Sequence, residues 1–323
     1  MQTPKPQPTT APRHVDAVVI GRNEGARLAA CITSLVGQVG RVIYVDSGST
    51  DGSADMAAGL GATVVALDMT QPFTAARARN AGLEQVTAPF VQFVDGDCMV
   101  QPDWVATAMD FAARHPDAAV ICGRRRERFP EASVFNRLCD REWDTAIGQA
   151  AACGGDALMQ TDALRAVGGY RDTLIAGEEP ELCLRLAQNG GQIWRIDAEM
   201  TLHDAAMTRF AQWWSRSRRA GHAYGEGAAL HGAPPVRHWV RETRRALIWG
   251  AGVPIAAIGL GLIHPLGFLV LLAWPLQMLR LSPRLGPETA FFTVLGKLPE
   301  AQGVLGYWWG RITRKRATLI EYK

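Results

Sequence analysis

Acidic side chains stand directly after apolar segments in this chain, and their spacing suggests a chemistry. One apolar run ends in Asp95-Gly96-Asp97, and two others end at Asp46 and Asp68. Two carboxylates held close together without a cation repel each other. Mg2+ or Mn2+ would relieve that repulsion, because these ions take oxygen ligands and complete their shell with substrate phosphates. Asp-Gly-Asp is also ordinary turn chemistry, so the motif alone leaves a metal–diphosphate site and a plain turn both open.

The elements that must position these acids alternate over the first 120 residues. Short apolar runs predict strands at 17–20, 41–46, 62–68, 89–95 and 118–123. Helical spacing predicts helices within 24–36, 47–61, 73–85 and 102–115. This alternation predicts an α/β fold with a mainly parallel sheet and flanking helices. Ligands bind beyond the carboxyl ends of such strands, so the polar groups after the first four strands are expected to converge on one rim.

Other candidate residues lie outside the strand ends. Arg79, near the start of a predicted helix, either pairs with a phosphate oxygen or is a surface arginine. Glu178 and Glu179 precede Pro180 at a predicted helix start, where acids either serve catalysis or favour the helix N-terminus. His203 follows a strand-like run and either completes a metal shell or packs as a hydrogen-bonded histidine.

Four motifs in order carry a resemblance to a known family. They are VVIGRNEGARLAACITSL, VDSGSTDGSADMA, RARNAG and FVDGDC. Together they resemble the donor half of a family 2 glycosyltransferase with the GT-A fold. The likeness continues through GGDALMQTDALRAVGGY and GEEPELCLRL, and so covers residues 15–232. It implies transfer of a sugar from a nucleoside diphosphate sugar to a hydroxyl acceptor, with inversion.

The resemblance assigns roles to residues of the donor side. Glu24 and Asp46 match the acids that hold the nucleobase and ribose. Asp46 has a second interpretation, in which it belongs to the cap of the next helix. Asp95 and Asp97 match the D-x-D motif, with Asp97 the stronger metal ligand. Asp68 is expected on the same rim.

The catalytic base of the family comes from a Glu-Asp pair that opens a helix. This chain has Glu178-Glu179 there, so the base would extend one methylene further. The role is assigned to Glu179, with Glu178 as the rival. A crowd of like charges raises the pKa of such a base toward neutrality.

The acceptor side is less defined in the sequence. Gly155 and Asp156 are expected to line the acceptor site, although Gly155 could simply supply an unusual backbone turn. Trp213 and Trp214, on a predicted helix, contact the acceptor, pack in the core against the catalytic domain, or face the membrane. The order QWWSR departs from the Gln-x-x-Arg-Trp signature of processive members of the family, so no polysaccharide synthase is inferred.

Charge is distributed unevenly along the chain, and the use of cysteine favours a reducing compartment. Residues 1–234 hold 22 Lys/Arg and 27 Asp/Glu, whereas residues 235–323 hold 12 and 4. The six cysteines show no C-x-x-C and no metal-type spacing with histidine, which favours reduced, packed thiols. The N-terminal segment is polar and proline-rich, which predicts a disordered tail without a secretory signal.

A long uncharged segment predicts contact with a membrane. Residues 246–279 contain no Asp, Glu, Lys or Arg. Since one span needs about 20 residues, this length suits a hairpin of two short arms that turns at His264-Pro265. The alternative is a buried helix pair in a soluble protein. Arginines flank both sides, which predicts both ends on the cytoplasmic face: Arg237, Arg241, Arg244, Arg245, Arg280 and Arg284.

The sequence thus predicts a tail (1–14), a nucleotide-sugar-binding half (15–123), an acceptor and catalytic half of the same domain (124–232), and a basic membrane-associating region (233–323). The acceptor expected beside a membrane is a lipid-linked or envelope glycan. Anionic lipid is preferred to nucleic acid as the partner of the basic region. Two other classes are weighed: a nucleotidyltransferase, for which GRNEGARL is a poor phosphate loop, and a non-catalytic, membrane-tethered sugar- or nucleotide-binding module.

Overall fold

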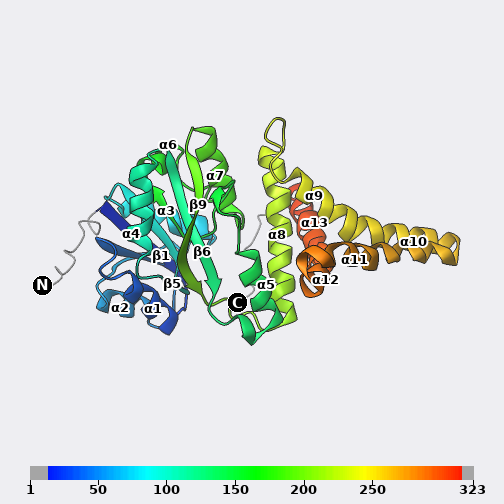
Figure 1. Ribbon diagram of the computed structural model, residues 1–323, viewed down its shortest axis with the longest axis horizontal. Helices are drawn as coiled ribbons and strands as arrows, with labels where there is room; N and C mark the ends of the chain where they lie inside the picture. Colours follow the sequence, from blue (N-terminus) through cyan, green and yellow to red (C-terminus); the bar gives the residue numbers. More distant parts are fainter. Residues whose placement is uncertain (1–13, 315–323) are drawn as a thin grey trace, which may run out of the picture. The chain divides into compact units, whose positions relative to one another are not determined.

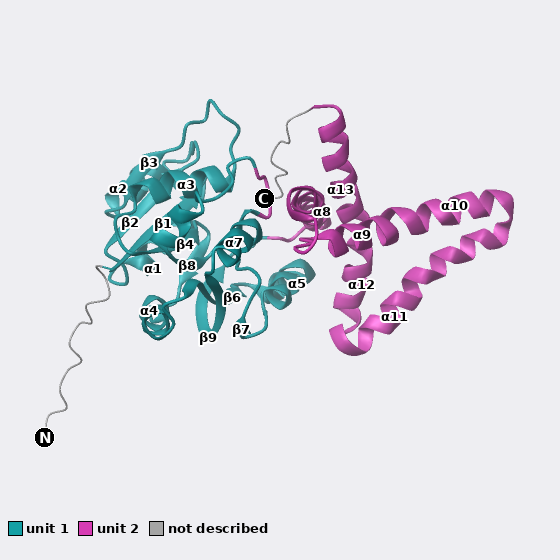
Figure 2. Ribbon diagram, turned by 90° about the horizontal axis from the view of Figure 1, so that it is seen from above, with its two compact units in different colours: residues 1–173, 178–206 teal, residues 174–177, 207–323 magenta. Residues whose placement is uncertain are grey.

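The computed structural model describes residues 14–314 and divides the chain into two compact units (Figure 2). Unit 1 comprises residues 1–173 and 178–206, and unit 2 comprises residues 174–177 and 207–323. The division after residue 206 falls earlier than the predicted limit at 232. The expected tail, apart from His14, lies outside the described residues, as do Lys315 and Arg316.

Unit 1 is built on a mixed nine-stranded sheet (Figure 1). Its strands follow the order β3-β2-β1-β4-β8-β6-β9-β5, and β7 pairs with β9. Strands β1 to β4 are parallel, β8 runs antiparallel to both β4 and β6, and β5 and β7 run antiparallel to β9. The strands are β1 (Val15–Gly21), β2 (Arg41–Asp46), β3 (Thr63–Ala66), β4 (Phe90–Asp95), β5 (Cys98–Val100), β6 (Ala118–Glu127), β7 (Gly148–Gln149), β8 (Ala157–Gln160) and β9 (Gln192–His203).

The parallel part of the sheet agrees with the sequence prediction, and the strands after residue 127 lie outside the segment for which alternation is predicted. The predicted fifth strand ends at residue 123, but β6 continues four residues further through a run of arginines. The helices of unit 1 are α1 (Ala26–Leu35), α2 (Ser53–Gly59), α3 (Ala75–Gln85), α4 (Trp104–Arg114), α5 (Val134–Glu142), α6 (Thr161–Ala166) and α7 (Glu178–Gln188).

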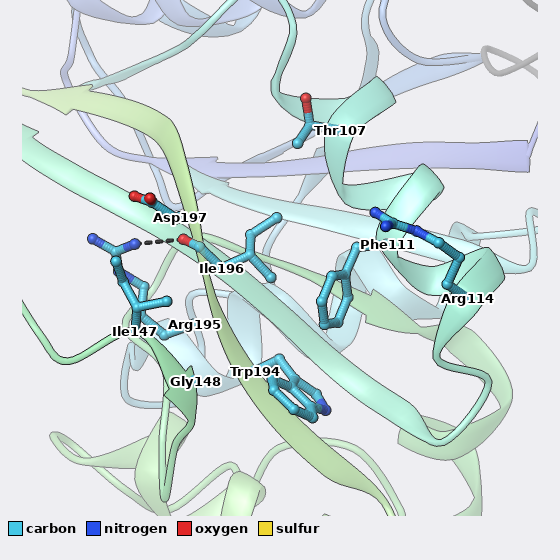
Figure 3. Close-up of a pocket in the computed structure, with 9 residues that line it drawn as sticks. All are labelled: Thr107, Phe111, Arg114, Ile147, Gly148, Trp194, Arg195, Ile196 and Asp197. Carbon is cyan, nitrogen blue, oxygen red and sulfur yellow. Dashed lines mark hydrogen bonds between the residues drawn. The ribbon is translucent and has the colours of Figure 1, made fainter.

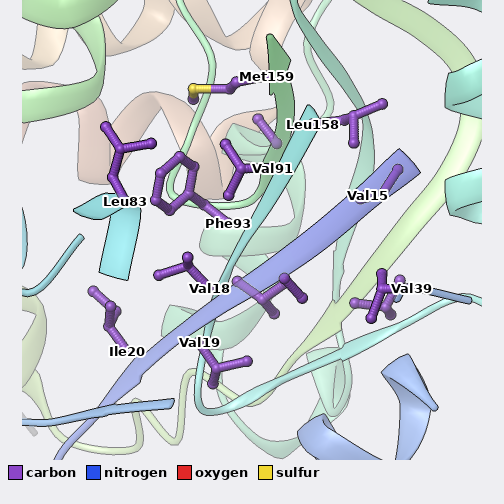
Figure 4. Packing of buried hydrophobic residues seen from close by; sticks show 14 of the residues in the cluster. Val15, Val18, Val19, Ile20, Val39, Leu83, Val91, Phe93, Leu158 and Met159 are labelled. Atoms are coloured by element: carbon purple, nitrogen blue, oxygen red, sulfur yellow. The ribbon is translucent and has the colours of Figure 1, made fainter. Parts of the chain in front are cut away.

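The core lies around the central strands, whose apolar side chains are buried on both faces (Figure 4). Val18 and Val19 point to opposite faces of β1 and are both fully buried. Helix α3 packs closely on β1 because residue 82 is glycine. A Cβ atom there would lie 2.3 Å from Cγ1 of Val18. This close approach brings the first turns of α3 near the carboxyl edge of the sheet.

Unit 2 is helical and contains two apolar helices that form a hairpin (Figure 1). By length and composition, residues 240–263 and 265–285 could each cross a membrane. His264 separates them, where the sequence predicts a turn. The helices of this unit are α8 (Phe210–His231), α9 (Val240–Leu247), the π-helical η3 (Ile248–Gly252), α10 (Val253–Ile263), the 3-10 helix η4 (Pro265–Leu272), α11 (Ala273–Leu285), α12 (Pro287–Leu295) and α13 (Lys297–Ile312).

Candidate active site

The topology of unit 1 brings polar side chains from five strands to one edge of the sheet. Strands β2, β4, β6 and β9 point the same way and end at or beside this edge, and β8 begins there because it is antiparallel. The register makes Glu127 and His203, the last residues of β6 and β9, direct partners. Asp156 precedes β8 and accepts a hydrogen bond from the backbone N–H of Asp95 at 3.0 Å.

Arg79 connects the two acidic groups of this edge. Its guanidinium lies 2.8 Å from Asp95 Oδ1, 3.1 Å from Glu178 Oε1 and 3.0 Å from Glu179 Oε1. The side chain is only 3% exposed, so it is not a surface arginine. Burial alone would lower the pKa of Arg79, but the surrounding carboxylates, Glu179 foremost, raise it well above its usual value. Arg79 is therefore a permanent internal cation.

Glu178 and Glu179 open α7, as the sequence predicts. Glu178 is buried, whereas the Glu179 side chain keeps 13% exposure. Burial and the neighbouring charge of Glu178 raise the pKa of Glu179 to about 7, and Arg79 opposes that rise. A carboxyl group with such a pKa exchanges its proton near neutral pH, which is what a general base requires.

Asp97 and His203 meet through the pairing of β5 with β9, in which Cys98 lies opposite His203. Their Oδ2 and Nε2 atoms are 3.3 Å apart, and Cys98 Sγ lies close enough for all three to share one ion. Burial, and then the charge of Arg125, lower the pKa of His203 to about 3. The imidazole is therefore neutral at physiological pH, the form that binds metals. The linear spacing of cysteine and histidine did not indicate this contact, which spans 105 residues.

The charges at this edge suit a divalent cation. Two arginines stand among five carboxylates: Arg79 and Arg125 with Asp95, Asp97, Asp156, Glu178 and Glu179. The negative excess is held in a buried setting, where unpaired anions are costly. The donor set offers carboxylate oxygens and one imidazole, which fits Mg2+ or Mn2+. Asp97 and His203 would hold such an ion.

Three residues of the site were missed from the sequence. Arg125 lies between Asp95 and Asp156, with Nη2 3.1 Å from Asp95 Oδ2. Its guanidinium also stacks over the Trp143 ring at 4.9 Å, and that ring meets His203 edge-on. Glu127 Oε2 lies 3.9 Å from His203 Nδ1. The sequence signal for Arg125 and Glu127 was the RRRE run at the end of the predicted fifth strand, which ends at the same edge of the sheet as the acids.

The predicted donor-side acids occupy ordered loops. Asp46 accepts hydrogen bonds from the hydroxyl of Tyr44 and from the backbone N–H groups of Gly48 and Ser49. Glu24 pairs with Arg27 at 2.7 Å. Its Cγ lies 3.3 Å from where a Cβ on Gly96 would be, so Glu24 stands beside the Asp-Gly-Asp turn.

Asp68 follows β3, the strand at one end of the strand order. It is solvent-exposed and accepts hydrogen bonds from Thr70, which lower its pKa, and from Gln71. The backbone oxygen of Asp68 accepts a hydrogen bond from Arg77. The predicted donor-binding roles of Glu24, Asp46 and Asp68 stay predictions.

The residues predicted to bind acceptor lie in both units. A Cβ on Gly155 would approach Arg79 Nη2 to 2.6 Å and Asp95 Oδ2 to 2.7 Å, so a side chain at this position would have to displace this ion pair. Asp156 is fully buried and also accepts a hydrogen bond from Thr201 Oγ1. The structure thus gives Asp156 internal partners, and its contact with acceptor remains a prediction.

Trp213 and Trp214 belong to α8 in unit 2. Trp213 is buried against Phe210 and Phe292, and Trp214 donates a hydrogen bond to Gln302. These contacts lie within the helical unit, so packing against the catalytic domain and membrane-side contact, the alternatives for both tryptophans, also stay predictions. Contact with an acceptor stays a prediction for them as well.

A cavity of about 270 Å3 lies elsewhere on unit 1, between α4, β9 and the short β7 (Figure 3). Phe111, Trp194 and Ile147 supply apolar surface, and Arg114 and Arg195 lie at its margin. None of the predicted site residues lines it.

The sequence is similar to those of known glycosyltransferases. Residues 16–148 match the family model of Glycosyl transferase family 2. Pre-mycofactocin glycosyltransferase of Mycobacterium tuberculosis is 27% identical over 273 residues, which are 80% of this chain and 56% of that protein. The chain thus spans about half the length of that relative. Succinoglycan biosynthesis protein ExoA of Rhizobium meliloti is 25% identical over 251 residues, 72% of this chain and 74% of that protein.

Solved structures share the fold. The mannosyltransferase PcManGT from Pyrobaculum calidifontis, in complex with GDP-Man and Mn2+, superposes with a TM-score of 0.67 at 17% identity, covering 95% of this chain and 90% of that one. Residues 1–349 of S. aureus TarS give a TM-score of 0.51 at 14% identity, covering 87% and 89%.

The mixed sheet, with carboxylates, arginines and a histidine at its carboxyl edge, has the fold of the GT-A type. Residues 16–148 match the model of Glycosyl transferase family 2, so this part of the chain is similar to a family 2 glycosyltransferase domain.

Proposed function

We propose that this protein transfers a sugar from a nucleoside diphosphate sugar to a hydroxyl acceptor, with inversion and with the help of Mg2+ or Mn2+. The observation that carries the proposal is the single buried network that joins Asp95, Arg79 and Glu179 next to the Asp97–His203 pair. This network supports the proposal because a group of candidate cation ligands and a carboxyl group with a pKa of about 7 lie at one edge of the sheet.

The chemistry follows from the roles of these groups. Glu179 accepts the proton of the acceptor hydroxyl while the oxygen of that hydroxyl bonds to the anomeric carbon of the donor sugar. The bond from that carbon to the diphosphate oxygen breaks, and its electron pair leaves with the nucleoside diphosphate. A divalent ion held by Asp97 and His203 would neutralise the charge that grows on the departing diphosphate. One displacement by one nucleophile inverts the configuration.

The apolar hairpin of unit 2 supports an acceptor at a membrane. Its tip exposes Leu262 and Ile263 at 83% and 82%, and arginines stand at its base. Such a hairpin favours insertion from the cytoplasmic side, with the positive charges kept at the anionic lipid surface. A lipid-linked or envelope glycan is the acceptor class that suits this location.

The experiment is to incubate the protein with UDP-, GDP- and dTDP-sugars in the presence of Mn2+ and to measure the small products. Free nucleoside diphosphate, from transfer or slow hydrolysis, supports the proposal. Pyrophosphate would indicate nucleotidyl transfer, and the absence of both products would indicate a binding module. The variant Asp97→Ala should bind its donor without the Mn2+-dependent gain in melting temperature. Normal turnover in that variant would contradict the metal site.

A further inference from the structure

Arg125 is the residue at the site whose role neither the motifs nor the relatives assign. It lies on β6 with its side chain 13% exposed. Its Nη2 lies 3.1 Å from Asp95 Oδ2 and 3.4 Å from Cys98 Sγ, and its Nε lies 3.4 Å from Asp156 Oδ2. The aromatic face of Trp143, 4.9 Å from the guanidinium carbon, holds it in this position.

Two groups of potential metal ligands overlap at this point. Asp97, Cys98 and His203 form one, and Asp95, Cys98 and Asp156 form the other, each with its ligand atoms within 4.8 Å of one another. The second group would be a strong trap for a cation, because Asp156 is fully buried and two carboxylates without a cation are costly. Arg125 contacts all three members of the second group.

The charge of Arg125 is permanent. Burial alone would lower the pKa of Arg125, but Asp156, Cys98 and Asp95 raise it well above its usual value. A guanidinium has its charge spread over a planar fork, which suits two carboxylates at once. It cannot be exchanged with solvent ions as a bound metal can.

We propose that Arg125 acts as a built-in cation that closes the Asp95–Asp156 group and thereby restricts the protein to one divalent ion, at Asp97 and His203. Asp95 is then held by Arg79 and Arg125 and stays oriented for the donor instead of turning to the metal. Arg125 is thus a positioning residue that sets metal stoichiometry. This inference rests on the proposed function in one respect only, which is that a divalent ion binds at Asp97 and His203.

The test is a Mn2+ titration of the full chain, read as free Mn2+ by electron paramagnetic resonance. The unchanged protein should bind one ion per chain, and Arg125→Gln should bind two. A matched control is Arg126→Gln, which removes an exposed ion pair with Glu199 and should leave one ion bound. One ion of unchanged affinity in Arg125→Gln would overturn the inference.

Two further variants show where each ion binds. Asp97→Ala should bind no Mn2+, whereas the double variant Arg125→Gln with Asp97→Ala should regain one ion at the opened group. Arg125→Lys keeps the charge and should bind one ion, so two ions there would also overturn the inference.

The titration also remains decisive if Arg125→Gln does not fold, which its melting curve would show. In the otherwise unchanged chain, Asp156→Asn should leave Mn2+ affinity unaltered, because Arg125 and not the ion occupies that carboxylate. A loss of the ion in Asp156→Asn would contradict the role of Arg125. An unchanged protein that binds no Mn2+ would instead contradict the metal in the proposed function.

Discussion

At the scale of single residues, the two glutamates that open α7 have different surroundings although they share one arginine. Glu178 is buried, and Glu179 keeps partial exposure and a pKa raised to about 7. An acceptor hydroxyl can approach only an exposed oxygen, so these properties favour Glu179 as the base. Arg79 holds both side chains in place and limits how far the pKa rises.

The base assignment predicts a pH dependence. Glu179 must be deprotonated to accept a proton, so kcat/KM should rise with pH and level off above about 7. The variant Glu179→Gln should lose this rise of kcat/KM with pH. Its transfer rate should fall about 100- to 10,000-fold, with donor binding retained. Glu178→Gln serves as the comparison. If Glu178→Gln lost the rise of kcat/KM with pH and Glu179→Gln kept it, Glu178 and not Glu179 would be the base.

At the scale of elements, the site depends on how closely helices approach the sheet. Helix α3 carries Arg79, and Gly82 one turn later lets the helix lie against Val18 and Val45 of the two central parallel strands. The position of the arginine relative to Asp95 is therefore set by a glycine that touches no ligand. Gly155 has a similar effect on the opposite side of the ion pair.

The close approach predicts a difference between two alanine substitutions in helices. Gly82→Ala places a Cβ 2.3 Å from Val18 Cγ1, so overpacking should cost about 1–3 kcal/mol of unfolding free energy. Gly59→Ala, in α2, gains the same helix propensity and meets nothing within 4 Å. Denaturant unfolding should show the first variant destabilised and the second not. Equal stability of the two would contradict the packing argument.

The first four strands and their helices could be predicted from the sequence because each strand is a mainly apolar run followed by polar residues. The second half of unit 1 could not. Strand β6 ends in charged residues that read as a loop, and β9 mixes charged and apolar residues. Its pairing with β5 joins segments far apart in the chain, and no local pattern indicates such a register. Hence Asp97 was assigned from its motif, whereas Arg125 and Glu127 were missed.

At the scale of the whole molecule, the chain combines an α/β unit that carries the acidic edge with a helical unit that exposes apolar side chains. The candidate spans at 240–263 and 265–285 are almost entirely unburied within the described residues. Water-exposed apolar surface of this extent indicates a lipid or protein partner. The arginines at both ends of the hairpin favour lipid.

The hairpin predicts membrane binding that depends on its tip. Replacing Leu262 and Ile263 by asparagine should reduce co-flotation with vesicles that contain anionic lipid, because the tip would no longer enter the hydrocarbon layer. Val36→Asn removes an equally apolar side chain, 65% exposed, from unit 1 and is the control. Undiminished flotation of the double variant would assign the hairpin to a protein partner.

The pairing of β5 with β9 also bears on biosynthesis. The acids of the first strands leave the ribosome long before residue 203, which supplies the imidazole beside Asp97. Until then the emerging chain carries Asp95 and Asp97 without that neighbour. A ribosome-bound nascent chain should therefore bind the cation proposed for Asp97 and His203 only after the ninth strand has cleared the exit tunnel, however early the parallel strands assemble.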